Sequence, residues 1–288
     1  MKITYFGLPL GALVLHGDGH EVRAIVRQPG ALGLRRLRRR MPVELRAELD
    51  EPFIASIHAD LIVSWFWTRR LPRAVLDRAP AIGVHPSLLP RWRGPDPTFW
   101  AIASGDATTG VTAHVLHDAY DTGPILGQRT LALDPTWNAW TLARKLDRPS
   151  LALLRDVVSR FAMGSPPPGR TQNEAEATEA PTPDEGMLEI RWSRPAADIE
   201  RLVRAAAPWP GAFTEIGGKT VVLTSVRVAK PPAGLSPGQA WVRNGIAVVQ
   251  AEDHGIELLE GRFEEEDRPL DALALAGLAR QARLASTP

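Results

Sequence analysis

Two short stretches of the chain hold residues whose types could do chemistry. In AIGVHPSLLPRWRGPDP, residues 81–97, His85 stands between a short apolar run and a loop rich in proline and arginine. A histidine at a strand end can serve as a catalytic base because its pKa lies near neutrality, although a lone histidine there is more often structural. In HVLHDAYDTGPIL, residues 114–126, two histidines stand near Asp118 and Asp121. Their spacing is not that of a metal site, so we predict no metal and interpret them as a strand-end pair beside a pocket.

The bulk composition indicates an ordinary globular protein of two domains. The chain has 288 residues, 44% apolar and 23% charged, and this length exceeds the usual size of one domain. Lysine plus arginine (34) nearly balances aspartate plus glutamate (33), so no global field attracts nucleic acid or membrane. Cysteine is absent, which excludes disulfides and thiolate chemistry and is compatible with the cytoplasmic location that we expect.

The amino-terminal residues 1–26 resemble a secretory signal only superficially. Gly7, Pro9 and Gly11 interrupt the apolar stretch, no small-residue cleavage site follows, and HEVRAIV continues as a strand. No apolar run approaches the ~18 residues of a membrane span, so we expect no membrane partner. GLPLG lacks the G-x-G-x-x-G spacing, and no acidic residue ends the second strand, so we expect no nicotinamide cofactor.

The elements around the candidate residues predict a parallel α/β sheet. KITYFG, an apolar helix-like stretch and HEVRAIV are typical of strand, turn, helix and strand. The run ADLIVSWFW at 59–67 is continuously apolar, as in a strand covered on both faces, and shorter strands are predicted at 81–85 and 109–116. His85 therefore ends one predicted strand, and Asp121 follows another.

A change of composition divides the chain. Residues 164–186 contain five prolines and no aromatic residue, which predicts an extended, exposed linker. A helix and five or six short strands separated by turn signals follow it, as in a small β-barrel. We therefore predict an α/β catalytic domain over residues 1–163, a linker over 164–186 and a small β domain over 187–288.

A basic cluster occurs in RRLRRR. It is either a solvated helix face or a surface for phosphates, because neighbouring guanidinium groups bind phosphate oxygens. Residues 188–288 do not reinforce nucleic-acid binding, since they contain 12 basic and 13 acidic residues. The members of the cluster are Arg35, Arg36, Arg38, Arg39 and Arg40.

The ordered motifs resemble the 10-formyltetrahydrofolate-dependent formyltransferases, a family that includes methionyl-tRNA formyltransferase, glycinamide ribonucleotide transformylase and amino-sugar N-formyltransferases. VHPSLLPRWRG is followed along the chain by a strand and DAYDTGPIL. IRWSRPAADIERLVRAAAPWPGAFT resembles the start of the OB-like carboxy-terminal domain of the tRNA and aminoarabinose enzymes. The resemblance implies a Rossmann-like catalytic domain. It is weakest at residues 28–58, where the chain is shortened and the loss of a strand or helix is expected.

The resemblance implies transfer of a formyl group from 10-formyltetrahydrofolate to an amine. That reaction needs a neutral amine, a stabilised tetrahedral oxyanion and removal of a proton. In the family an asparagine and a histidine contact the oxyanion, and an aspartate supports the histidine. His85 and Asp121 match the last two, whereas Gly83 stands where the family has asparagine. Losing one oxyanion donor costs about 10² to 10³ in rate, or roughly 3 to 4 kcal/mol.

Three interpretations of Gly83 stay open. A water, the Gly83 N–H or His114 supplies the donor in a specialised or slower enzyme. Alternatively, the acceptor needs the room that glycine leaves. In the third interpretation the protein has lost catalysis and binds folate or a partner only, although intact His85 and Asp121 argue against it.

The resemblance also suggests roles for two further groups of residues. The loop that shapes the substrate and oxyanion site is expected to include Ser87, Leu88, Leu89, Pro90, Arg91, Arg93 and Gly94, with an arginine meeting an anionic group. The pterin of the folate is expected near Trp67, Leu71, Asp118, Ala119 and Tyr120. Trp65 and Phe66 are assigned to the core.

The acceptor is either a small primary amine or a tRNA. We expect a small amine, such as an amino sugar or an amino-acid-derived metabolite, because His114 stands where small-molecule members commonly have histidine. The near-neutral carboxy-terminal domain, the shortened amino-terminal domain and Gly83 also oppose the tRNA. Initiator methionyl-tRNA is the alternative, since RRLRRR lies where the tRNA enzyme carries a basic loop.

Overall fold

The computed structural model describes residues 1–67, 69–230 and 234–285. Contacts between residues divide the chain into two units, which are described separately. The first unit holds Met1–Pro97, Thr108–Ala132 and Ala143–Pro181, and the second holds Thr98–Ala107, Leu133–Leu142 and Thr182–Pro288. Most of the predicted linker, up to residue 181, therefore belongs with the first unit.

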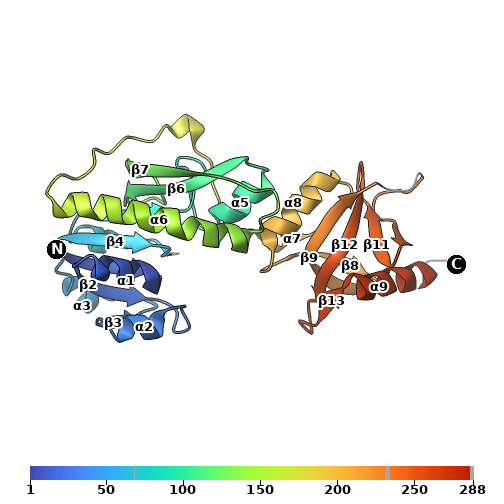
Figure 1. Cartoon of the computed structure of the whole chain (residues 1–288), viewed down its shortest axis with the longest axis horizontal. Coiled ribbons are helices and arrows are strands. Elements are labelled where there is room, and N and C mark those ends of the chain that lie inside the picture. The colour runs from blue at the N-terminus through green and yellow to red at the C-terminus, as the bar shows by residue number, and fades with distance from the viewer. Residues whose placement is uncertain (68, 231–233, 286–288) are drawn as a thin grey trace. The chain divides into compact units, whose positions relative to one another are not determined.

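A seven-stranded, mostly parallel sheet forms the centre of the first unit (Figure 1). Its order is β3-β2-β1-β4-β5-β6-β7, with β1 to β5 parallel and β6 and β7 antiparallel to their neighbours. The Rossmann-like fold class predicted from the sequence is confirmed. The strands are β1 (Lys2–Gly7), β2 (Glu21–Val26), β3 (Val43–Leu45), β4 (Leu61–Trp65), β5 (Ala81–His85), β6 (Thr108–Val115) and β7 (Ile125–Ala132).

Helices connect these strands and cover the sheet. On one of them, α6, Ser150 Oγ accepts a hydrogen bond from Trp65 Nε1 of β4 at 3.1 Å, so this helix packs directly on the sheet. The helices are α1 (Pro9–Gly17), α2 (Leu34–Arg38), α3 (Glu51–Ala55), α4 (Arg73–Leu76), α5 (Pro97–Ala103) and α6 (Ala139–Ala162).

The apolar strands explain where the candidate residues lie. All five residues of β5 are buried, as expected of an inner strand covered on both faces. Parallel strands joined by crossovers end at the same edge of the sheet, where ligands bind in open α/β folds. His85 is the last residue of β5, so the strand delivers it to this edge.

The region where a missing element was expected contains a strand and two helices. Residues 28–58 hold α2, β3 and α3, and β3 pairs with β2 at the edge of the sheet. Asp50 caps α3 by accepting the Phe53 N–H at 2.9 Å. On α2, Leu34 and Leu37 are buried, whereas the five arginines of the cluster are exposed.

The second unit is built on a six-stranded antiparallel sheet. Its order is β10-β11-β12-β9-β8, with β13 paired to β12. The predicted NG turn joins β10 to β11, and Asn244 (φ +51°) and Gly245 (φ +80°) adopt the left-handed conformations that such a turn needs. The strands are β8 (Ala212–Ile216), β9 (Lys219–Ala229), β10 (Ala240–Arg243), β11 (Ile246–Gln250), β12 (Gly255–Phe263) and β13 (Pro269–Asp271).

Helices α7 (Glu185–Leu188), α8 (Ala196–Ala206) and α9 (Ala272–Ala285) complete this unit. The amphipathic α8 buries Ile199, Leu202 and Val203, as its sequence pattern predicts. A small β domain preceded by a helix is therefore confirmed. In the part of the chain that the structure describes, no helix has the length and apolar character needed to cross a membrane.

Candidate active site

His85 has one ring nitrogen fixed by the backbone. Its side chain is 8% exposed, and Nε2 lies 2.7 Å from the carbonyl oxygen of Trp92. A carbonyl oxygen can only accept, so Nε2 carries a proton and donates it. Nδ1 lies 3.3 Å from Asp121 Oδ2. In the neutral imidazole Nδ1 is therefore the basic nitrogen, and it faces a carboxylate that stabilises the cation formed when it takes up a proton.

Burial keeps His85 available as a base. Burial lowers the pKa of His85 below its usual 6.5, while Asp121 and the Trp92 carbonyl offset part of this effect and His114 adds to it. Nδ1 is consequently unprotonated at neutral pH.

Asp121 approaches from the loop after β6 in an unusual backbone conformation. Its φ is +54°, in the left-handed region that residues other than glycine rarely adopt. Oδ2 accepts the Gly94 N–H at 2.9 Å, and Oδ1 lies 3.3 Å from His114 Nε2. Burial by itself would raise the pKa of Asp121, but His85, His114 and the Gly94 N–H outweigh it and hold this pKa well below its usual range. The carboxylate is ionised at neutral pH.

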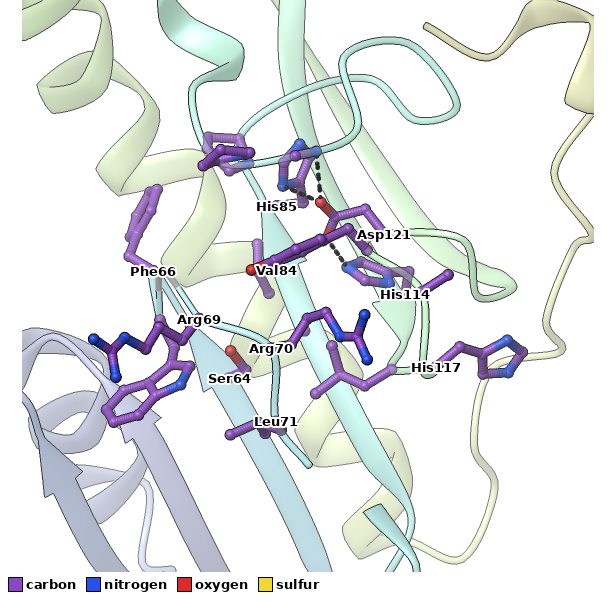
Figure 2. A pocket seen from close by; sticks show the side chains of 18 of the residues that line it. Ser64, Phe66, Arg69, Arg70, Leu71, Val84, His85, His114, His117 and Asp121 are labelled. Atoms are coloured by element: carbon purple, nitrogen blue, oxygen red, sulfur yellow. Dashed lines mark hydrogen bonds and ion pairs between the residues drawn. The ribbon is translucent and has the colours of Figure 1, made fainter. Parts of the chain in front are cut away.

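His114 is a second histidine on the same carboxylate. Its side chain is 2% exposed, and Nδ1 lies 3.0 Å from the carbonyl oxygen of Val115. Nδ1 therefore carries a proton, and Nε2 faces Asp121. Figure 2 shows Asp121 linked to both His85 and His114, whereas His117 points away from them. His114 and His117, the predicted strand-end pair, thus have different surroundings.

Gly83 leaves the space that His114 fills. The two residues are partners across β5 and β6. A Cβ on Gly83 would stand 3.2 Å from His114 Nε2 and 2.8 Å from Leu116 Cδ2, both closer than ordinary contact. The imidazole therefore lies where a larger side chain at position 83 would begin. Because β5 is paired on both edges, the sheet uses the Gly83 N–H, which is thus not free for a ligand.

The loop over residues 86–96 is held by buried hydroxyl groups. Thr112 Oγ1 donates to the carbonyl of Ser87 at 2.7 Å and accepts the Leu89 N–H at 3.0 Å. Ser87 Oγ donates to the carbonyl of Arg91 at 2.6 Å. Ser87 and Leu89 therefore shape the loop from within.

A cavity opens at this edge of the sheet. The Trp67 Nε1 is buried from solvent and has no hydrogen-bond partner among the described residues. No group of three His, Asp or Glu side chains in the described ranges is placed to hold a metal. Of the predicted residues, the cavity is lined by Trp67, Leu71, Gly83, His85, Gly94, His114, Ala119, Tyr120 and Asp121.

The other predicted residues lie outside the cavity lining, and two arginines among them have protein partners. Asp118 forms an exposed ion pair with an arginine of α4 at 3.3 Å. The Arg91 guanidinium lies 4.2 Å from the centre of the Trp92 ring, and Arg93 is hydrogen-bonded to Glu174. The expectation that one of these arginines meets an anionic ligand is therefore not supported. The residues outside the lining are Ser87, Leu88, Leu89, Pro90, Arg91, Arg93 and Asp118.

Several lining residues were not predicted from the sequence. Phe66 (φ +55°), which was assigned to the core, lines the cavity. Arg69 and Arg70 line it as well, and both are exposed cations. Their position directly after the apolar strand β4, at the edge where His85 lies, is a signal that could have indicated them.

A second cavity adjoins the first, with Phe66 and Trp67 common to both. Its walls are mainly apolar, with a few polar groups, as in many small-molecule sites. The polar residues are Arg27, Gln28 and Asp147.

Comparison with known proteins agrees with a two-domain group-transfer enzyme. The family model for formyl transferases matches residues 20–158, and the model for the formyl transferase C-terminal domain matches residues 184–276. The methionyl-tRNA formyltransferase of Chloroflexus aurantiacus is 33% identical and covers 96% of this chain and 97% of its own length. That of Anaeromyxobacter dehalogenans strain 2CP-C is 35% identical and covers 98% of both chains. The chain therefore belongs to the formyltransferase family and is a one-carbon group transferase.

Solved structures share the fold. WlaRD, a sugar 3N-formyltransferase, matches with a TM-score of 0.71 at 14% identity and covers 90% of this chain and 97% of its own. HypX from Aquifex aeolicus, solved in complex with tetrahydrofolic acid, matches with a TM-score of 0.71 at 20% identity. The match covers 96% of this chain and 47% of the HypX chain. Identities this low support the fold and leave the acceptor open.

Proposed function

We propose that the protein transfers the formyl group of 10-formyltetrahydrofolate to a primary amine. One observation carries the proposal: His85 Nδ1 and His114 Nε2 each lie 3.3 Å from one ionised carboxylate, that of Asp121, at the wall of a cavity. Buried groups with shifted pKa values in a cavity are the pattern expected of acid–base catalysis.

The first cavity suits the folate. The rings of Trp67 and Tyr120 and the Leu71 side chain offer apolar walls for the pterin. Arg69 and Arg70 are exposed cations on the lining. They are placed to attract the carboxylates of the folate tail.

In the proposed reaction the neutral amine nitrogen attacks the formyl carbon. A new C–N bond forms, and the carbonyl oxygen becomes an oxyanion. His85 Nδ1 takes the proton from the attacking nitrogen, and Asp121 stabilises the resulting imidazolium. The intermediate then collapses, the bond from carbon to folate N10 breaks, and the proton passes from His85 to N10. The products are the formylated amine and tetrahydrofolate.

His114 is our candidate for the missing oxyanion donor. Its Nε2 lies beside the point where an asparagine side chain on residue 83 would begin. The Gly83 N–H is used by the sheet, which leaves His114 or a water molecule.

Turnover with 10-formyltetrahydrofolate tests this function. We expect His85→Ala to lower kcat by about 10²- to 10⁴-fold, the usual contribution of a general base. His254→Ala is the matched control, because this histidine is half-exposed in the second unit. An enzyme with undiminished turnover after loss of His85 contradicts the mechanism. A protein that binds tetrahydrofolate by calorimetry but forms no product with any amine supports the interpretation that catalysis has been lost.

For the acceptor we propose a small primary amine. The second cavity adjoins the proposed folate cavity through Phe66 and Trp67. Its few polar groups, Arg27, Gln28 and Asp147, are suited to orienting a small polar molecule. A panel of amino sugars and amino acids as acceptors tests this choice. We expect Asp147→Asn to raise KM for the acceptor and leave KM for the folate within about twofold.

Methionyl-tRNA is the second candidate acceptor, favoured by the length-matched relatives and by the arginine cluster. All five arginines are exposed, and among the described residues no ion pair or hydrogen bond involves their side chains. The tRNA is the acceptor if the enzyme formylates methionyl-tRNA at low salt and loses this activity at high salt and when the five arginines are replaced by alanine. Product from small amines alone excludes it.

A further inference from the structure

Residues 170–181 of the predicted linker form a strap along the loop that follows His85. The Arg93 N–H donates to the carbonyl of Thr178 at 2.8 Å, and the Ala180 N–H donates to the carbonyl of Arg93 at 2.7 Å. Gly94 (φ +121°) lies so close that a Cβ would stand 2.9 Å from the Ala180 oxygen. The strap and the loop therefore fit each other, and position 94 requires glycine.

Gln172 is the buried anchor of the strap, at 5% exposure. Its Nε2 donates to the carbonyl of Asp121 at 2.7 Å and to the carbonyl of Gly123 at 2.8 Å. Its Oε1 accepts from Arg93 Nη2 at 2.8 Å and from Arg93 Nε at 3.1 Å. Both amide protons and the amide oxygen are thus used, and a buried amide with all its groups bonded has a single favourable orientation.

The amide clamps the turn that carries Asp121. This residue adopts a left-handed conformation that a non-glycine residue keeps only where its surroundings hold it. Gln172 binds the carbonyls at both ends of the turn, Asp121 and Gly123, from outside the turn. The carboxylate of Asp121 lies at the long distance of 3.3 Å from each histidine. A small displacement of the turn would therefore separate it from both.

Arg93 fixes Gln172 in turn. Its guanidinium donates to both carboxylate oxygens of Glu174, each at 2.8 Å, while it also donates to Gln172. Paired charged hydrogen bonds of this kind define an orientation strongly. A continuous chain of contacts thus runs from Glu174 through Arg93 and Gln172 to the backbone of Asp121.

We propose that Gln172 is a positioning residue, which holds the Asp121 carboxylate against His85 and His114 through the backbone of the Asp121–Gly123 turn. The inference rests on the proposed function, because it assigns the strap a part in the same reaction. The linker is then a component of the active site as well as a connection.

Two substitutions test Gln172. Gln172→Met keeps the length of the side chain and removes all four hydrogen bonds, and Gln172→Glu removes the two donors while keeping an acceptor for Arg93. Asn173→Ala is the matched control, since the neighbouring amide bonds only within the strap, to Glu176 and Ala175. We expect both Gln172 variants to lower kcat by about 10- to 100-fold, the usual effect of losing the partner that orients a functional group. In both Gln172 variants KM for the folate should stay within about twofold of wild type. The kcat of the Asn173→Ala control should stay within the same range.

An NMR titration of His85 separates positioning from a merely structural role. The groups that face His85 and Asp121 are His114, Arg93 and the Gly94 N–H. If the carboxylate moves away, His85 loses the charge that raises its pKa, so it should titrate at lower pH in Gln172→Met and unchanged in Asn173→Ala. Gln172→Glu is followed by kcat alone, because its added charge would itself raise the pKa of His85. An unchanged kcat, or a lowered kcat with an unchanged titration, overturns the inference. Absence of product from the wild type overturns the proposed function instead, and the titration alone then decides the position of Asp121.

Discussion

Substitution of Gly83 by asparagine tests whether this site is deficient or differently built. If glycine is a simple deficit, Gly83→Asn restores an oxyanion donor and raises the rate by up to about 10²- to 10³-fold. The structure leads us to expect the opposite. The new Cβ would stand 2.8 Å from Leu116 Cδ2 and 3.2 Å from His114 Nε2 before the rest of the side chain is added.

The expected magnitude follows from these distances. Leu116 can turn the end of its side chain, but His114 is held by the Val115 carbonyl at 3.0 Å and is only 2% exposed. Forcing extra atoms into such a packed position usually costs about 1 to 3 kcal/mol of stability. Displacement of His114 from Asp121 also removes the proposed oxyanion donor, so kcat should fall by about 10²-fold.

Steady-state kinetics and urea unfolding of three variants measure both effects. Gly83→Ala adds the Cβ alone and should lose less activity than Gly83→Asn. The double variant Gly83→Asn with His114→Leu removes the imidazole that the amide would meet, so it should be faster than Gly83→Asn alone. A Gly83→Asn enzyme as fast as wild type would falsify our account of His114. Strictly additive effects in the double variant would do the same, because residues in contact should not act independently.

Four further outcomes follow from the site. The kcat/KM of the wild type should fall as pH drops through the lowered pKa of His85, and Asp121→Asn should move this limb to still lower pH, because it removes the charge that raises that pKa. A pH–rate profile checks both. Arg70→Ala should raise KM for the folate by about two- to fivefold, since an exposed charge pair contributes at most ~1 kcal/mol. Thr112→Val should lower the free energy of unfolding by about 1 to 3 kcal/mol in urea, because it leaves buried backbone groups of the loop unpaired. Removal of charge at residues 35–40 should leave formylation of small amines unchanged if these are the acceptors.

The sequence predicted the fold class and the two central residues well, for a physical reason. Apolar strands, turn signals and the order of the motifs are local features, so the end of β5 and the loop after β6 could be located directly. The strands β5 and β6 are antiparallel, so they end at opposite edges of the sheet, and the histidine and the aspartate meet because the loop after β6 brings Asp121 back to His85.

The polar partners at the site could not be predicted in this way. The Trp92 carbonyl that fixes the His85 tautomer depends on the path of an irregular loop, and the sequence alone had favoured the carboxylate for that role. The strap brings Gln172 to Asp121 from 51 residues away. No periodicity reports such a contact, and a proline-rich composition indicates exposure rather than a buried anchor.

The arrangement of the two histidines explains why glycine at position 83 and catalysis are compatible. His85 and His114 each use one nitrogen on a backbone carbonyl, so each has one nitrogen left, and both of these face Asp121. A proton on one ring disfavours a proton on the other, and the charge of His114 indeed lowers the pKa of His85. An asparagine at position 83 would supply a donor but would take the space of His114. This space therefore holds either the asparagine side chain or the His114 ring.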